Sequence, residues 1–426
     1  MKEAEVCRLA AAALTAIVCG CEEQPTRATA IVVDSAGVQV VTNPPGRIEA
    51  VEDWSLSSEP IVEIGGGANP VTPLYQVTAV HPLPDGSVVV GTDSPPRALV
   101  LRADGTIQSS LGREGEGPGE FSSVGSVVSL GDDSLAVWDP NRRRMSVFTI
   151  GGEYAREVDL GDVAPQSPEA AGSTRVPAGF THLLPLPSGS LVVFVVAVWG
   201  PDNVESGVQR LAMVSHRIDA GGNRLAEYGP FVGMELHASP AAGLAPFPFG
   251  TETFGAVSGD ALVVGTAETP ELRFYAPDGA LERIVRWEDR DRTLAGNALL
   301  LDFDTWVDAQ LARRGPRDEA VLREILEAIP EPERFPAYSG IISDQLSGET
   351  WVGEYPGQLG MMGLTPEVRP MPSRQWLAFE ADGTLIATVQ VPPGFDPRAL
   401  LEGRVWGVFR DELGVESVRA YEIVRR

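Results

Sequence analysis

Residues 80–90 read VHPLPDGSVVV, and this stretch indicates the fold class. An Asp-Gly turn lies between two strand-forming runs, which is the strongest short-range signal for a β-hairpin. The pattern of an apolar run, a turn with Gly or Asp and a second strand recurs along the chain. Its further copies lie at residues 128–137, 184–193, 256–264, 342–352 and 399–406.

A second hairpin pattern follows most copies of the first. Its turns are again rich in Gly and Asp, as in LRADGTI and FEADGTL, and its copies lie at residues 101–107, 148–154, 218–225, 274–281 and 379–385. Two hairpins in succession make a four-stranded meander, and meanders repeated radially are the blades of a β-propeller. The sequence therefore predicts an all-β, six-bladed β-propeller over residues 31–426.

The last unit ends one strand short of a complete meander. A β-branched stretch at residues 31–41 stands alone before the first unit and could supply the missing strand. Pairing it with the C-terminal blade would close the ring and cover two sheet edges that would otherwise invite aggregation. We therefore expect the propeller to be closed by its N-terminal strand.

One segment, residues 288–334, interrupts the repeat between the fourth and fifth blades. Two groups of apolar residues there have helical spacing, and Pro330 would end the second helix: Phe303, Trp306, Val307 and Leu311, then Leu322, Ile325, Leu326 and Ile329. This pattern predicts an inserted helical hairpin. It could be a lid packed on a propeller face or an element that docks a partner.

The Gly-rich stretch at residues 111–121, LGREGEGPGEF, resembles the segment between blades in NHL-type propellers. From about Ile31 onward the chain resembles the bacterial six-bladed TolB-like/NHL-like propeller lipoproteins. The resemblance implies the propeller fold and an extracytoplasmic location. It implies little about function, because one fold hosts many activities.

The N-terminus has the pattern of an export signal. Lys2 and Arg8 precede an apolar run, residues 9–18, that is too short to span a bilayer. The following residues, Val18-Cys19-Gly20-Cys21, resemble the bacterial lipobox, which implies cleavage after Gly20 and a lipid on Cys21. We therefore expect a signal peptide at residues 1–20, a tether at residues 21–30 and anchoring to a bacterial envelope membrane; an ordinary signal peptide cut nearby is the alternative.

Composition narrows the classes of partner and chemistry. The net charge of −26 and the pI of about 4.5 would repel phosphate backbones, so nucleic acid is not expected as a partner. The three cysteines are Cys7, Cys19 and Cys21, which leaves the rest of the chain without a thiol nucleophile or a disulfide.

Candidate site residues are few, and the sequence shows no recognisable catalytic set and no cofactor-binding motif. His81 and His182 occupy similar places in the first and third units, so both could approach the central channel. Glu114, Glu116 and Glu120 of the Gly-rich stretch could contact a ligand or a cation. We expect a non-catalytic binding or scaffold module for a protein, peptide or glycan ligand. The alternative is a channel-centred enzyme of the lactonase or lyase kind, which would use Ca²⁺ or Zn²⁺.

Overall fold

The described part of the chain folds mainly into β-strands, most of which pair antiparallel. The computed structural model describes residues 29–66, 71–131, 133–161, 163, 182–196, 206–239, 243–247, 249–293, 333–355 and 374–425. Within these ranges there is one helix, α1 (Arg47–Ala50). None of the described helical structure has the length and apolar character needed to cross a bilayer. The all-β prediction is confirmed.

The strands form successive meanders. The first contains β5 (Val77–Pro82), β6 (Val88–Asp93), β7 (Pro96–Leu101) and β8 (Ile107–Leu111). The second contains β11 (Ser126–Ser129), β12 (Ser134–Asp139), β13 (Arg144–Thr149) and β14 (Tyr154–Asp159). The third contains β15 (Leu183–Pro185), β16 (Leu191–Val196), β17 (Gly207–Ile218) and β18 (Arg224–Ser239), with β19 (Gly243–Pro246) at its edge.

The remaining meanders follow the same order. The fourth contains β20 (Phe254–Ser258), β21 (Ala261–Gly265), β22 (Glu271–Tyr275) and β23 (Leu281–Arg286). The fifth contains β24 (Gly340–Ser343), β25 (Thr350–Gly353), β26 (Arg374–Phe379) and β27 (Leu385–Val391). The last contains β28 (Phe395–Leu401), β29 (Arg404–Arg410) and β30 (Glu416–Val424). Every hairpin that the turn pattern predicts is present.

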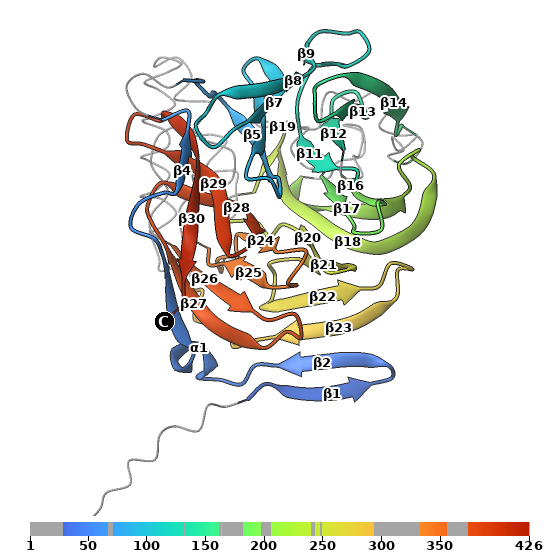
Figure 1. The fold of residues 1–426 in the computed structure, drawn as a ribbon. Helices are drawn as coiled ribbons and strands as arrows, with labels where there is room; N and C mark the ends of the chain where they lie inside the picture. Colours follow the sequence, from blue (N-terminus) through green and yellow to red (C-terminus); the bar gives the residue numbers. More distant parts are fainter. Residues whose placement is uncertain are drawn as a thin grey trace, which may run out of the picture.

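The first strands of the meanders surround a common centre (Figure 1). In the order β5, β11, β15, β20, β24 and β28, each contacts the next, and β28 contacts β5 again. We call these the inner strands. Meanders arranged radially around a ring of inner strands have the architecture of a β-propeller.

The N-terminal segment closes the ring differently from the sequence expectation. Residues 31–41 are not one strand but a hairpin of β1 (Ile31–Ser35) and β2 (Val38–Thr42), because Ala36 and Gly37 turn the chain with φ of 56° and 87°. β2 pairs in parallel with β23 of the fourth meander. The expected pairing of residues 31–41 with the last blade is therefore wrong.

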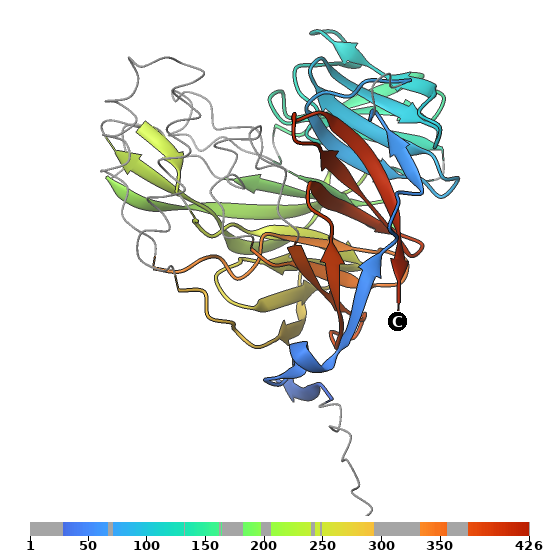
Figure 2. The ribbon, with the colours of Figure 1, turned by 90° about the vertical axis from the view of Figure 1, so that its left-hand side faces the viewer.

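A later strand, β4 (Val62–Ile64), completes the last meander by pairing with β30. Ile64 is 1% exposed and packs in a cluster with Trp406 and Val418. Between β2 and β4, β3 (Glu52–Leu56) pairs in parallel with β27. The segment thus covers the outer edges of three successive meanders, as the blue strands in Figures 1 and 2 show.

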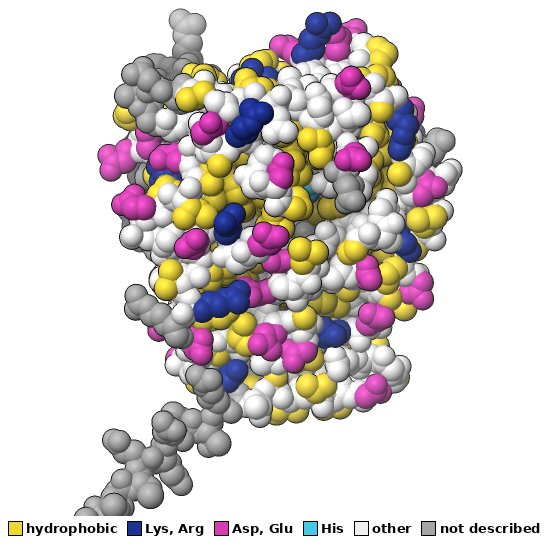
Figure 3. Space-filling view, viewed as in Figure 1, with side chains coloured by type: hydrophobic (Ala, Val, Ile, Leu, Met, Phe, Trp, Pro, Cys, Tyr) yellow, Lys and Arg dark blue, Asp and Glu magenta, His cyan; other side chains and the backbone are white. Residues whose placement is uncertain are grey.

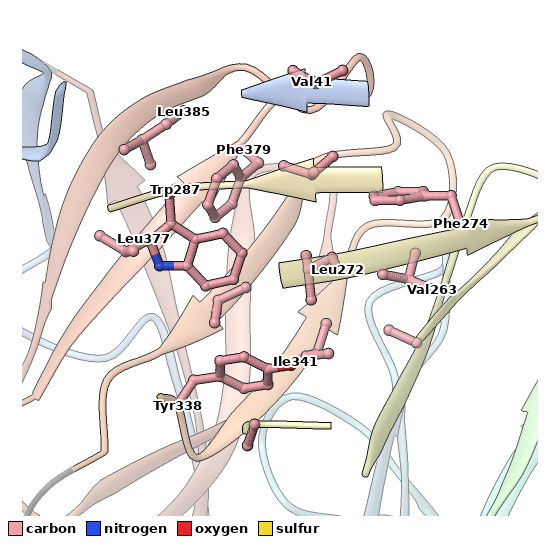
Figure 4. Close-up of a cluster of buried hydrophobic side chains, with 14 of the residues drawn as sticks. Val41, Val263, Leu272, Phe274, Trp287, Tyr338, Ile341, Leu377, Phe379 and Leu385 are labelled. Atoms are coloured by element: carbon pink, nitrogen blue, oxygen red, sulfur yellow. The ribbon is translucent and has the colours of Figure 1, made fainter. Parts of the chain in front are cut away.

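Apolar side chains fill the space between neighbouring meanders. Figure 4 shows one such cluster, where the ring of Trp287 contacts both Tyr338 and Phe379 between the fourth and fifth meanders. Trp138, Trp351 and Trp406 are at most 2% exposed and belong to other clusters of this kind. Large buried aromatic rings therefore hold adjacent meanders together.

Some sequence predictions fall outside the described residues. These are the signal peptide at residues 1–20, the tether up to residue 28, the lipidation site Cys21, and the helices expected within residues 294–332. The described ends of the inserted segment, residues 288–293 and 333–334, contain no helix.

Candidate functional site in the central channel

The inner strands run in the same direction, so the two ends of the channel differ. The imidazole Nε2 of His81 lies 2.8 Å from Ser129 Oγ, which places the ends of β5 and β11 together. Gln345, just after β24, donates from Nε2 to the carbonyl oxygen of Pro185 at the end of β15 (2.8 Å). Ser258, at the end of β20, donates to the carbonyl oxygen of Gly348 (2.8 Å).

Tight turns occupy the end of the ring where the inner strands finish, which we call the turn face. Several turn aspartates cap their own backbone there, as the sequence predicts. Asp85 Oδ1 accepts from Ser87 N at 2.9 Å, and Asp382 Oδ1 accepts from Thr384 N at 2.8 Å. These carboxylates have a structural role within the turns.

The opposite end of the ring, where the inner strands begin, holds the strand ends that three long connections join, and we call it the loop face. These connections join Asp159 to Leu183, Arg286 to Gly340 and Gly353 to Arg374. Gly353 lies at this face because it pairs with Gly340, the first residue of β24. Binding residues are commonly carried on long loops that a rigid scaffold positions.

The channel wall carries one ion-pair cluster. Along the inner strands, all of which the structure describes, the only ionisable acid and the only Lys or Arg are Asp396 and Arg398 of β28. Arg398 Nη2 lies 2.6 Å from Asp396 Oδ2, and Arg374 Nη2 lies 2.8 Å from Asp396 Oδ1. Arg374 is 4% exposed, whereas the side chain of Arg398 is 45% exposed.

Burial and the neighbouring arginines act on the pKa of Asp396 in opposite directions. Burial acts to raise it, but Arg398, Arg374 and Arg410 outweigh burial and hold the pKa of this carboxyl below its ordinary value. Asp396 is therefore ionised at neutral pH and shares its charge between two guanidinium groups.

His182 faces this cluster from another part of the ring. It immediately precedes β15, and β15 and β28 are not neighbours in the ring. Part of its side chain reaches solvent, yet burial by the surrounding protein and then the positive charge of Arg398 lower the pKa of His182. The imidazole is therefore neutral at pH 7, and the charge of Arg398 acts on it across the channel.

His81 lies near the turn face, bonded to Ser129. Burial lowers the pKa of His81 to about 4, so this imidazole is also neutral at pH 7. The described residues contain no group of three or more His, Cys, Asp or Glu that could hold a metal ion. The structure thus places His81 and His182 on different inner segments without a cluster of ligands around either.

The Gly-rich stretch forms a compact loop beside the first two meanders. Glu120 accepts from Gly117 N and from Arg113 Nε, both at 2.8 Å, and these bonds lower its pKa. Gly112 has a φ of 70°, and a Cβ there would lie 2.2 Å from a backbone oxygen. Glu114 and Glu116 are exposed, so they remain free to meet a ligand while Glu120 is engaged within the loop.

A partly buried carboxyl group lies at the loop face. Burial raises the pKa of Glu252, just before β20, to about 7. Burial and then the charge of Glu252 raise the pKa of Tyr355, whose hydroxyl has no hydrogen-bond partner among the described residues. A pocket of about 250 Å³ adjoins Tyr355 and is also lined by Arg290, Phe335 and Glu354.

The raised pKa of Glu252 predicts a pH-dependent stability. The folded state holds this proton more tightly than the unfolded chain, so the stabilisation is complete below about pH 4.5 and is lost as the pH rises through about 7. From pH 4.5 to 7.5 we expect the wild type to lose on the order of 2 kcal/mol relative to Glu252→Gln. Urea unfolding of both proteins at each pH measures this difference; parallel pH profiles would contradict it.

Sequence reasoning missed Asp396, Arg398 and Glu252. None belongs to a spaced motif, and the partner Arg374 lies on a different strand. A signal was present in the segment Phe395–Leu401, FDPRALL, where two charges interrupt a run that otherwise suits an inner strand. The space-filling view shows a hollow near the centre of the ring, with a histidine side chain visible inside it (Figure 3).

Comparisons with known proteins bear on the fold. No family model matches the sequence, and no curated protein matches it. A solved member of the DUF4221 family from Bacteroides vulgatus matches with a TM-score of 0.50 at 11% identity, over 88% of this chain and 99% of that one. Its likeness concerns the fold alone and agrees with a β-propeller.

Two further solved structures match less well. A Bacteroides fragilis protein described as exported has a TM-score of 0.45 at 9% identity, over 88% of this chain and 99% of that one. Virginiamycin B lyase from Staphylococcus aureus has a TM-score of 0.38 at 10% identity, over 81% of this chain and 94% of that one.

Proposed function

We propose that this chain is an exported, six-bladed binding propeller that takes a protein, peptide or glycan ligand at its loop face. The observation that supports this proposal is the asymmetry of the ring: tight turns that cap their own backbone lie at one face, and the strand ends that the long connections join lie at the other. Scaffolds that position long loops at one end commonly bind there. The cyclic contacts of the inner strands support six blades.

The channel groups favour binding over catalysis. Asp396 is tied to two arginines, and His81 is neutral and bonded to Ser129. Both carboxylate oxygens of Asp396 are therefore engaged by arginines. His81 does lie beside the hydroxyl of Ser129, as a base lies beside a nucleophile, but its pKa of about 4 makes it a weak general base at neutral pH. Arg398, in contrast, is partly exposed and can meet a ligand that enters from the loop face.

Hydrogen exchange can locate the binding face. The full-length protein would be incubated with muramyl-peptide fragments, a random peptide mixture or a neutral oligosaccharide mixture. We expect at least one to slow exchange at residues 249–255, 286–293 and 354–355, with no change at residues 84–87 and 382–384. Protection confined to the turn face, or none with any mixture, would contradict the proposal.

Anchoring at Cys21 is part of the proposal. The residues that support it are the apolar leader and the lipobox-like Val18-Cys19-Gly20-Cys21. Replacing Cys21 by Ser should move the protein from the membrane fraction to the soluble fraction after cell lysis. Retention in the membrane would argue against lipidation.

One observation favours the enzymatic alternative. Glu252 combines a pKa of about 7 with a position at the loop face, and such carboxyls can act as general acids or bases. A channel-centred lactonase or lyase would also need a bound Ca²⁺ or Zn²⁺. Metal analysis of protein purified without chelators distinguishes the binding propeller from the metal-dependent enzyme. A stoichiometric metal ion supports the enzyme, and the absence of such an ion rules the metal-dependent enzyme out.

A further inference from the structure

We propose that Arg398 binds a carboxylate group of the ligand inside the channel. This inference rests on the proposed binding function and adds the chemical class of the ligand. It starts from the charges of the channel wall: β28 carries both ionised side chains of the described inner strands, and Arg398 is the only cation among them. Because the protein has a net charge of −26, a positive charge on the channel wall indicates a place where an anionic group of the ligand can bind.

Arg398 has hydrogen-bond donors that its ion pair with Asp396 does not use. Asp396 directs Oδ1 to the buried Arg374 at 2.8 Å and Oδ2 to Arg398 at 2.6 Å. Arg410, the third arginine near Asp396, is 2.8 Å from Glu416. A guanidinium has five N–H donors, and the bond to Asp396 Oδ2 leaves others for a ligand.

The cluster also holds Arg398 in place. Asp396 is fixed by the buried Arg374, which lies over the ring of Trp376 with its guanidinium carbon 5.7 Å from the ring centroid. Arg398 is therefore oriented before a ligand arrives, which reduces the entropy lost on binding. Its side chain is 45% exposed, so an incoming group can reach it.

The opposite side of the channel is compatible with an anion. The charge of Arg398 contributes to the lowered pKa of His182, so the imidazole is neutral at pH 7. It can donate one N–H to a ligand without adding charge. Nearby Asp396 would repel a dianion more strongly than a monoanion. A carboxylate therefore fits this place better than a phosphate, and guanidinium recognises a carboxylate through paired hydrogen bonds.

The test uses four small probes at low ionic strength, measured by calorimetry or NMR titration on the full-length protein. N-Acetyl-alanyl-alanine is compared with its C-terminal amide, and glucuronate with glucose. We expect a carboxylate probe to bind and its neutral counterpart to bind at least about tenfold more weakly. The two pairs also distinguish a peptide terminus from an acidic sugar as the source of the carboxylate.

Substitutions of Arg398 test whether this residue is the one that binds the carboxylate probes. Arg398→Gln should weaken carboxylate binding about tenfold or more, and Arg398→Lys should weaken it less. Arg273→Gln is the matched control, because Arg273 is exposed and pairs with Glu271 on β22. The unfolding transition of each variant verifies that it folds.

Two outcomes would overturn the proposal: no probe binds the wild type, or Arg398→Gln binds the carboxylates as well as the control does. Either result leaves the loop-face proposal standing if hydrogen exchange shows protection there. Loss of that protection would instead remove the proposed function itself.

Discussion

Replacing Ile64 by Asp is expected to unfold the ring. Ile64 is 1% exposed on β4 and packs with Trp406 and Val418, so the substitution buries a carboxylate among apolar side chains and removes a core residue. We expect a loss of at least about 4 kcal/mol, a large part of the total stability of an ordinary domain. Urea unfolding followed by tryptophan fluorescence measures it.

Val33→Asp is the matched control for this variant. Val33 lies on β1, in the segment that the sequence first suggested for closure, and is 55% exposed. Its free energy of unfolding should change by no more than about 0.5 kcal/mol. Equal destabilisation by the two substitutions would show that β4 has no special role in closing the ring.

Asp396→Asn is expected to be the second most destabilising change. The amide keeps the size of the side chain but removes the charge that the buried Arg374 faces at 2.8 Å. Breaking a buried ion pair from one side costs about 3–5 kcal/mol. Thermal unfolding at pH 7 would measure this loss against Glu268→Gln, whose half-exposed pair with Arg210 should contribute under about 1 kcal/mol.

The sign of the pH effect gives an additional check on Asp396. Its folded pKa is lowered, so its stabilisation is present above the ordinary carboxyl pKa and is lost as the pH falls through the lowered value. The difference between wild type and Asp396→Asn should therefore shrink in acid. A difference that stays constant from pH 7 into acid would mean that the carboxylate charge is not the cause.

Local turn chemistry explains why the hairpins were predictable. Asp85-Gly86 and Asp382-Gly383 give tight turns with glycine at positive φ, and the flanking β-branched runs then pair with their neighbours in sequence. The class of the fold follows from repeating this local unit. No long-range information was needed.

Closure of the ring could not be predicted in the same way. β2 pairs in parallel with β23, so Val40 meets Ile284, and β4 pairs with β30 at the other end of the chain. β-branched strands at residues 31–41 and at β4 are both suitable for an outer edge. Packing of Ile64 beside Trp406 decides between them, and this contact has no local signature.

The candidate site was predictable only in part. His182 was expected near the channel from its place in the repeat, and the charge of Arg398 does act on it. The cluster of Arg374, Asp396 and Arg398 escaped notice because it joins the inner strand β28 to β26 of the preceding meander. Ion pairs between adjacent meanders depend on their packing, which a single sequence does not reveal.

The most direct test of ring closure is a disulfide between its two ends. Glu63 of β4 and Arg419 of β30 are cross-strand partners, and their side chains form an ion pair at 2.7 Å. With Cys7, Cys19 and Cys21 replaced by Ser, a Glu63→Cys/Arg419→Cys variant should oxidise to a species that migrates faster on a non-reducing gel. Val33→Cys/Arg419→Cys should stay reduced. A crosslink in the Val33 pair but not in the Glu63 pair would contradict closure by β4.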